Sequence, residues 1–352
     1  MSYKTRINKW RRTLFRSLTK NILNSQIDRT IKGTDIRRIL IIRPNHRLGN
    51  QLLITPLIQE VSRTFPKAKV DLFVKGGVAP AIFKNYKCIN AIFALPKKPF
   101  KSLWAYTSTW FRMIRGHYDL VINAVANSSS GRLAARFIEA PLKISGEPDT
   151  EPRNTQYTHH IALRPVFSFR EFVSKLEGRR DEVSLPYLDI KLSSAEVVQG
   201  KITLDTLTGN SDPTIALYTF ATGAKCYSPE WWNHFHSEMH AVFSGYNLIE
   251  ILPVENVSQL DFRLPSFYSK DIREIASVIA NCVVFVGADS GIMHLASASG
   301  VPTVGLFAVT DMESYRPYNP GSTAIDTRTG SVTEWVEIIR SVVSHQIRQV
   351  ED

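Results

Sequence analysis

The sequence predicts an α/β protein built from two parallel-sheet domains, and three observations support this. The chain has 352 residues, of which 43% are hydrophobic and 21% charged. This composition is typical of globular proteins and excludes disordered, collagen-like and disulfide-scaffold chains. Short apolar runs alternate with segments of helical spacing, as in parallel sheets with crossover helices, and this alternation restarts in the second half. A chain of this length exceeds what one core usually spans, so we expect two domains.

The first half contains four runs of β-branched and apolar residues that are typical of buried parallel strands. A glycine-bearing turn at His46–Asn50 follows the first run. Apolar residues then recur at helical spacing from Leu52 to Phe65. The expected strands are Arg38–Arg43, Val70–Val74, Ile89–Leu95 and Tyr118–Asn123.

The second half repeats this pattern after a less regular stretch at residues 140–212, which contains five prolines. The domain boundary is expected near residues 190–212. A helix is expected over Asp271–Asn281, with Ser269 as its N-cap. The expected strands are Thr214–Tyr218, Asn247–Leu252, Cys282–Val286 and Thr303–Phe307.

Composition also bears on location and on metal binding. No stretch reaches the roughly 18 apolar residues of a membrane span, and no signal peptide is evident, so a cytosolic protein is expected. The three cysteines lie far apart without CxxC spacing. They are expected to be free thiols, and no metal site is predicted.

The positive charge is confined to the amino-terminal arm. Residues 1–47 hold 13 Lys or Arg against two acids, whereas the rest of the chain is balanced. Read as a helix, residues 7–22 place an apolar stripe with Trp10 opposite several basic side chains. Such a helix suits an anionic membrane surface, which we expect residues 1–30 to contact. Packing on the body of the protein is the alternative. Nucleic-acid binding is disfavoured, because nothing beyond residue 47 extends a basic groove.

The most informative motif runs from Val286 to Ala298, where an apolar strand is followed by small residues and a helix expected to begin near Ser290. Unpaired N–H groups at a helix N-terminus suit a phosphate or diphosphate, and Gly291 allows close approach of a ligand. Asp289 suits sugar hydroxyls and His294 a phosphate. In the alternative interpretation, Asp289 or Ser290 is only an N-cap and His294 is a satisfied helix residue.

A second motif, Tyr218–Trp232, again follows a strand with a small-residue loop before a helix that begins at Pro229. Its Thr222 and Lys225 suit phosphate oxygens, although a solvated lysine is the alternative. No P-loop motif occurs, and no GxGxxG follows the first strand.

The third motif, Arg43–Pro56, is the loop and helix start after the first strand. His46 in this loop has the intrinsic pKa of a base at neutral pH. A simple solvated loop histidine is the alternative.

Together these motifs resemble glycosyltransferase family 9, the heptosyltransferase type of lipopolysaccharide core biosynthesis. The family shows a basic-Leu-Gly-Asp turn and a Thr-Pro helix, similar to Arg47–Asn50 and Thr55-Pro56 here. Ala224-Lys225 before Pro229 also matches. The most specific likeness is that of Asp289-Ser290-Gly291-Ile292-Met293-His294-Leu295-Ala296 to the family's Asp-Thr-Gly-x-x-His-Leu-Ala.

This resemblance implies a GT-B architecture, two Rossmann-like domains facing a cleft, and an inverting reaction without a metal or other cofactor. The acceptor is then expected on the N-terminal domain, where we assign Arg47 and Gly49 to it, and the nucleotide sugar on the C-terminal domain. The residues matched to the donor are Thr222, Lys225, Asp289, Ser290, Gly291 and His294.

One departure from the family concerns the general base, because Asn50 stands where the family has an aspartate. An amide cannot accept the proton of the acceptor hydroxyl at neutral pH. His46 is one candidate base, with Asn50 orienting the acceptor. A second hypothesis is that another carboxylate is the base, and a third is that the protein binds its ligands without catalysis. A second departure is Pro253–Asn256, which lacks the expected Gly-rich turn, so ADP-heptose is not assumed as the donor.

The sequence therefore predicts an inverting glycosyltransferase that moves heptose or another hexose-type sugar from a nucleotide-diphosphate donor to a lipopolysaccharide-core or other lipid-linked acceptor. It is expected in the cytoplasm, peripherally bound to the inner face of the plasma membrane. The rivals are a non-catalytic sugar-nucleotide or glycolipid binder and a sugar-nucleotide epimerase. The expected parts are an arm at 1–36, an acceptor domain at 37–190, a linker at 191–212 and a donor domain at 213–352.

Overall fold

The computed structural model describes residues 35–96, 103–125, 128–148, 157–178 and 184–351. The chain separates into two compact units that are discontinuous in sequence. Among the described residues, the first holds those within 35–47, 54–80 and 86–186, and the second holds those within 48–53, 81–85 and 187–351. The basic arm lies outside the described residues.

The first unit is a parallel sheet with helices on both faces. Within the described residues its sheet has five strands in the order β3-β2-β1-β4-β5, all parallel. Helices α5 and α6 cover one face and pack on an apolar cluster that includes Phe73 and Met113. On α7, Phe169 packs its ring edge-on against Phe65 at 5.8 Å. The strands are β1 Arg38–Ile42, β2 Lys69–Lys75, β3 Ile89–Leu95, β4 Leu120–Asn123 and β5 Leu142–Ser145. The helices are α3 Thr55–Thr64, α5 Leu103–Ile114, α6 Ser129–Phe137 and α7 Arg164–Glu177.

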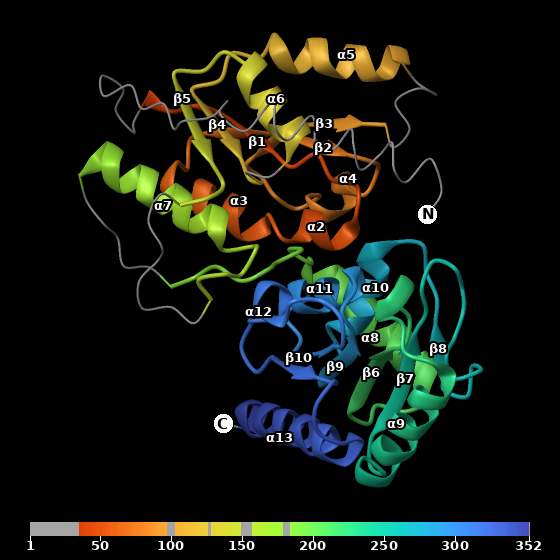
Figure 1. Cartoon of the computed structure of the whole chain (residues 1–352). Coiled ribbons are helices and arrows are strands. Elements are labelled where there is room, and N and C mark those ends of the chain that lie inside the picture. The colour runs from red at the N-terminus through yellow and green to blue at the C-terminus, as the bar shows by residue number, and fades with distance from the viewer. Residues whose placement is uncertain (1–34, 97–102, 126–127, 149–156, 179–183, 352) are drawn as a thin grey trace, which may run out of the picture. The chain divides into compact units, whose positions relative to one another are not determined.

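The second unit is also a parallel sheet between helices. Its described strands are ordered β11-β10-β9-β6-β7-β8. Aromatic residues of α9 and α13, among them Trp232 and Trp335, form the core on one face. Helices α8, α10 and α11 lie on the other face (Figure 1). The strands are β6 Thr214–Tyr218, β7 Asn247–Ile251, β8 Ser266–Phe267, β9 Val284–Ala288, β10 Thr303–Phe307 and β11 Thr323–Asp326. The helices are α8 Ser194–Thr208, α9 Pro229–Val242, α10 Ile272–Ile279, α11 Gly291–Ala298, α12 Met312–Tyr315 and α13 Val332–Glu351.

Two short helices, α2 Leu48–Leu52 and α4 Ala79–Ile82, lie where the chain passes between the units. The sequence predicts a turn up to Asn50 and one helix from Leu52 to Phe65. Instead, α2 begins at Leu48 and α3 begins afresh at Thr55, with Pro56 in its first turn. A proline inside one continuous helix would lose a hydrogen bond and clash with the preceding turn.

The stretch at residues 140–212 is more regular than the sequence predicts, because it holds β5, α7 and α8. Helix α8 lies in the expected linker at 191–212. It begins with a capping box between Ser193 and Glu196 and ends at Gly209, whose φ is +73°. Pro165 occupies the first turn of α7 rather than interrupting it. The two α/β domains are confirmed, whereas the exact domain bounds remain a proposal.

The N-cap of α10 is Asp271 and not Ser269. The Asp271 carboxylate accepts from the N–H of Arg273 at 2.7 Å. Ser269 instead accepts from the N–H of Asp271 and donates to Glu274. The expected helix starts at Pro229 and Ser290 are confirmed, with Ser290 as the cap of α11.

Candidate active site

The carboxyl edge of the second sheet brings Lys225 and Asp289 together. Strands β6 and β9 are neighbours in this sheet, so the loops that follow them leave the same edge. Asp289 follows β9 and stays in register with β10, because its N–H donates to Leu306 O at 3.1 Å. Lys225 lies in a short 3₁₀ turn after β6, Gly223–Lys225, and its Nζ donates to Asp289 Oδ2 at 2.5 Å. The buried carboxylate therefore fixes a partly exposed ammonium group at this edge.

Helix α11 begins beside this ion pair. Ser290 accepts from the N–H of Met293 at 3.2 Å and so acts as the N-cap. Asp289, which the sequence also offered as a cap, is bonded to Lys225 instead. The first N–H groups of a helix have no partners within the helix, and its dipole favours anions there. An ammonium group and a helix N-terminus thus lie together, which suits a diphosphate.

His294 lies on the first turn of α11 and is buried, with 6% of its surface exposed. Burial lowers the pKa of His294 to about 4, the Asp289 carboxylate acts in the opposite direction, and Lys225 lowers it further. The imidazole is therefore neutral at pH 7. Its ring lies 6.4 Å from that of Tyr315 on α12, centroid to centroid.

Gly49 and Gly291 allow α2 and α11 to pack closely within the second unit. A Cβ at Gly49 would lie 2.7 Å from His294 Cδ2, and a Cβ at Gly291 would lie 3.2 Å from the Gly49 backbone N. The sequence predicts that Gly291 leaves room for a ligand, whereas in the structure the side on which a Cβ would lie faces α2. The first and third motifs are thus in direct contact through their glycines.

The other predicted site residues lie on more exposed surfaces. Thr222 is exposed at the start of the 3₁₀ turn that carries Lys225. His46 and Arg47 are exposed on the loop after β1, in the first unit. Asn50 is half-buried on α2, in the second unit. The structure therefore joins Lys225, Asp289, Ser290, Gly291, His294 and Gly49, whereas the roles of His46, Arg47, Asn50 and Thr222 remain predictions.

Strand β7, beside β6, carries a buried carboxylate, Glu250, that was not predicted from the sequence as a site residue. Glu250 is fully buried, accepts from the hydroxyl of Thr219, and accepts from Ser258 Oγ at 2.5 Å. Burial raises its pKa, while these two hydroxyls oppose the shift. Ser258 also accepts from the N–H groups of Leu260 and Phe262, so Glu250 anchors the loop that follows β7. The sequence signal that could have identified Glu250 is an acidic residue among the apolar residues of the expected strand Asn247–Leu252.

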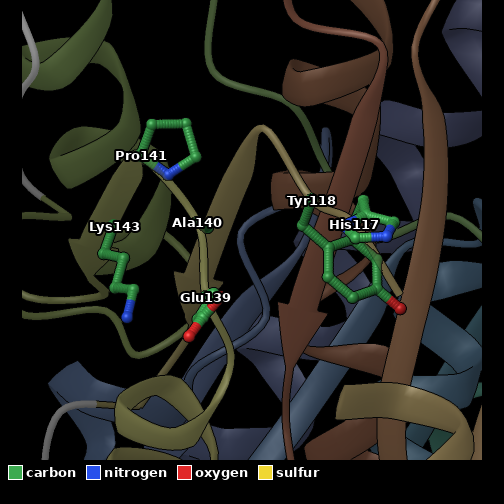
Figure 2. Close-up of a pocket in the computed structure, with 6 residues that line it drawn as sticks. All are labelled: His117, Tyr118, Glu139, Ala140, Pro141 and Lys143. Atoms are coloured by element: carbon green, nitrogen blue, oxygen red, sulfur yellow. The ribbon is translucent and has the colours of Figure 1, made fainter. Parts of the chain in front are cut away.

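A cavity of about 410 Å³ lies in the first unit, where Tyr118 and Pro141 precede β4 and β5 (Figure 2). It is therefore at the amino edge of the sheet, away from the edge where parallel sheets bind ligands. The Tyr118 hydroxyl donates to buried Asp71 at 3.1 Å. None of the predicted site residues lines this cavity.

Within the described residues no group of three His, Cys, Asp or Glu is placed to hold a metal ion, and no helix is long and apolar enough to cross a membrane. None of the three cysteines, Cys88, Cys226 and Cys282, forms a disulfide bond.

Comparison with known proteins places this site in a family context. The model of glycosyltransferase family 9 (heptosyltransferase) matches residues 269–337, which include β9 and α11. Lipopolysaccharide heptosyltransferase 3 of Escherichia coli K12 is 25% identical over 292 residues, covering 77% of this chain and 82% of that protein. Lipooligosaccharide heptosyltransferase 2 of Haemophilus influenzae is 23% identical over 322 residues, covering 82% and 88%.

Solved structures show the same fold. A family 9 glycosyl transferase from Veillonella parvula has a TM-score of 0.70 at 16% identity, covering 89% of this chain and 99% of that chain. The Escherichia coli heptosyltransferase WaaC, solved with ADP, has a TM-score of 0.60 at 16% identity, covering 88% and 99%. These likenesses confirm the GT-B fold class. In sequence motifs and fold the chain thus resembles glycosyltransferase family 9, whose relatives named above are lipopolysaccharide and lipooligosaccharide heptosyltransferases, and it is a glycosyltransferase of the heptosyltransferase type.

Proposed function

We propose that this enzyme transfers a heptose or another hexose-type sugar, with inversion and without a metal, from a nucleoside-diphosphate donor to a lipopolysaccharide-core or other lipid-linked acceptor. The observation that supports it best is the Lys225–Asp289 pair beside the N-terminus of α11. The donor is then held by the second unit, and the acceptor by the domain expected at 37–190.

In this proposal Lys225 and the first N–H groups of α11 bind the donor diphosphate. Asp289 is already paired with Lys225, so it aims the ammonium group and its remaining oxygen accepts from sugar hydroxyls. Thr222 adds a hydroxyl from the same loop. Neutral His294 supports the start of α11 and is a hydrogen-bond donor toward a phosphate oxygen. The Lys225 ammonium group and the positive end of the α11 dipole stabilise the charge that develops on the diphosphate as it leaves.

The reaction is a direct displacement at the anomeric carbon. The acceptor hydroxyl oxygen forms the new bond to this carbon, while the bond to the diphosphate oxygen breaks and its electron pair leaves with the diphosphate. His46 is our candidate for the base that takes the hydroxyl proton, with Asn50, Arg47 and Gly49 on the acceptor side. Replacing His46 by Ala should abolish turnover and leave donor binding intact. Near-normal turnover would exclude this base.

ADP is the first nucleotide to test, because the heptosyltransferase WaaC was solved with it. The experiment is thermal unfolding of the full chain with ADP, UDP, GDP, CMP or no ligand. A nucleotide at about a hundred times its Kd adds roughly 2.7 kcal/mol, which raises Tm by several degrees.

Asp289→Ala and Lys225→Ala should lose this shift. Asp326→Ala is the matched control, because Asp326 also ends a parallel strand of this sheet and also pairs with a basic side chain, Arg328. It should keep the shift. If no nucleotide shifts the wild type, or if all three variants behave alike, the donor site is not where we place it.

The rival is a binder without catalysis, and Asn50 is the observation that favours it. This rival is supported if a nucleotide stabilises the chain but is not released from its nucleotide sugar when acceptor is present.

The proposal also includes a location. We place the enzyme in the cytoplasm against the inner face of the plasma membrane, with residues 1–30 on the lipid.

A further inference from the structure

Helix α5 of the first unit is apolar on two opposite faces. Its inner face carries Tyr106, Trp110 and Met113, spaced by four and three residues. Met113 is buried, and the two aromatic side chains pack partly buried against the same apolar cluster. This face holds the helix on its sheet, together with the Arg112 guanidinium, which lies 5.8 Å from the ring centroid of Phe93 on β3.

The outer face of α5 exposes large apolar side chains. Trp104 is 85% exposed and Phe111 63%, and their spacing of seven residues places them on one face of the helix. Ile114 lies one turn beyond Phe111 and is 40% exposed. Helix α6 covers the same side of the sheet (Figure 1). It ends in Phe137, which is 57% exposed. Single exposed apolar residues are ordinary, but a gathering of this kind marks an interaction surface.

The charge around this outer face is positive. Arg112 and Arg115 are exposed on α5, and Arg136 is exposed beside Phe137. Residues 103–118, which are α5 and the turn after it, contain two arginines, Arg112 and Arg115, and no Asp or Glu. The next exposed acid along the chain is Glu139. It lies near Lys143 of β5, where its charge opposes the lowering of the Lys143 pKa by burial. An anionic surface is therefore the complementary partner.

The helix also points its aromatic end in a definite direction. All strands of this sheet are parallel, and α5 connects β3 to β4, so its first residues start from the carboxyl edge of the sheet. Trp104 thus lies toward the edge from which the loop with His46 and Arg47 emerges after β1.

We propose that the outer face of α5 is a membrane-interface surface, which inserts Trp104 and Phe111 at the level of the headgroups of an anionic phospholipid layer. Tryptophan and phenylalanine favour this zone, and arginines beside them pair with lipid phosphates. A protein partner is disfavoured because the exposed aromatics and arginines lie on a helix that has no Asp or Glu. The proposal does not rest on the donor or on residues 1–34.

The test is co-sedimentation of the full chain with vesicles of phosphatidylcholine and phosphatidylglycerol (7:3) and with phosphatidylcholine alone. The variant Trp104→Ser/Phe111→Ser should lower the partition coefficient on the anionic vesicles at least tenfold. Arg112→Gln/Arg115→Gln should lower it several-fold and reduce its salt dependence. The matched control is Val198→Ser/Ile202→Ser, which removes a similarly exposed apolar pair from α8 and should partition as wild type.

The emission of Trp104 gives a second readout. Anionic vesicles should blue-shift the wild-type fluorescence, and Trp104→Phe should lose most of that shift. Equal partitioning of the α5 variant and wild type, or no vesicle binding by wild type, would overturn the proposal. A lower Tm of the α5 variant without vesicles would also overturn it, because the face would then be covered by protein, for example residues 1–34. The nucleotide-induced rise in Tm should be unchanged in the α5 variant, so failure here is distinct from failure of the proposed donor site.

Discussion

At the scale of single residues, the first turn of α11 can pack against α2 because Gly49 and Gly291 have no Cβ atom. Gly49 on α2 leaves room for the His294 ring, and Gly291 leaves room for Gly49. A ligand-binding role for the motif and a packing role for its glycines are therefore compatible, because the packing fixes the helix whose N-terminus meets the ligand.

Gly49→Ala should destabilise the protein. The added methyl group would lie 2.7 Å from His294 Cδ2, so α2 or the imidazole must shift. Overpacking of this kind costs about 1–3 kcal/mol, measurable by urea unfolding. Gly77→Ala is the control, because a Cβ there meets nothing within 4 Å and the backbone needs no positive φ. Equal stability of the two variants would mean that α2 moves aside freely.

The buried His294 should make stability depend on pH. Burial lowers its folded pKa to about 4, while the unfolded chain takes up a proton near the ordinary value of about 6.5. Its contribution is therefore complete above pH 6.5 and is lost as the pH falls toward 4. At about 1.4 kcal/mol per pKa unit, the loss is up to about 3 kcal/mol.

His294→Gln should flatten the dependence of unfolding free energy on pH between 6.5 and 4 relative to wild type. The measurement is denaturant unfolding across this pH range. A wild-type slope in His294→Gln would contradict the assignment.

At the scale of elements, one arginine ties several segments of the second unit together. Arg273 on α10 is 4% exposed and donates to both carboxylate oxygens of Glu196 at the start of α8, at 2.6 and 2.8 Å. It also donates to the backbone oxygens of Ala81, Ile190 and Lys191. The bonds that Glu196 accepts from Arg273, and to a smaller extent those from Ser193, hold the pKa of Glu196 well below its usual range.

Arg273→Met should therefore destabilise the fold strongly, because it removes two charge-assisted bonds from Glu196 and the side-chain donor of the Ala81 and Ile190 oxygens. Glu196 keeps its bonds from Ser193, and Lys191 O keeps its bond from Asn85. Removing one partner of a buried pair costs about 3–5 kcal/mol, and the lower end applies because Glu196 is partly exposed. Arg340→Met removes an exposed arginine that pairs with Glu337 one turn away, and Tm should stay near the wild-type value. Similar melting of both variants would refute the difference.

The elements that the sequence predicted well are those whose signal is local. The runs at Ile89–Leu95, Thr214–Tyr218 and Thr303–Phe307 match their strands at both ends. The last two are fully buried, and a buried parallel strand is recognised as a short, mainly apolar run. Helix α8 was missed although Ser193, Glu196 and Gly209 mark its ends, because its outer face carries exposed apolar residues and shows no helical stripe. The short β8, Ser266–Phe267, leaves almost no pattern to detect.

The candidate site was predicted in part for the same reason. Ser290 as an N-cap and the two loops at the sheet edge follow from local sequence. The Lys225–Asp289 bond, the contact of Gly49 with His294 and the buried Glu250 depend on residues far apart in the chain. A single sequence carries no local signal for such pairs.

At the scale of the whole molecule, the second unit is not a continuous piece of chain. It includes residues 48–53 and 81–85, which come before most of the first unit. The fragment 187–352 therefore lacks Gly49 beside α11, the Ala81 oxygen that accepts from Arg273, and Asn85, which donates to Lys191 O.

This fragment should melt at a lower temperature than the intact chain and be cleaved faster by a protease at the exposed α11 and α10. The measurement is limited proteolysis beside thermal unfolding of fragment and full chain. A fragment as stable and as protease-resistant as the second unit within the full chain would show that the two inserted segments are dispensable.

The discontinuity also sets the order of events during synthesis. About 240 residues separate the end of α2 at Leu52 from the start of α11 at Gly291. At translation rates of about 5–20 residues per second, α2 waits roughly 12–50 s for its partner helix. During this interval the buried side of α2, including Leu52, is presented on the nascent chain. The α2–α11 contact is consequently among the last parts of the fold to form on the ribosome, and the nascent chain is open to chaperones until then.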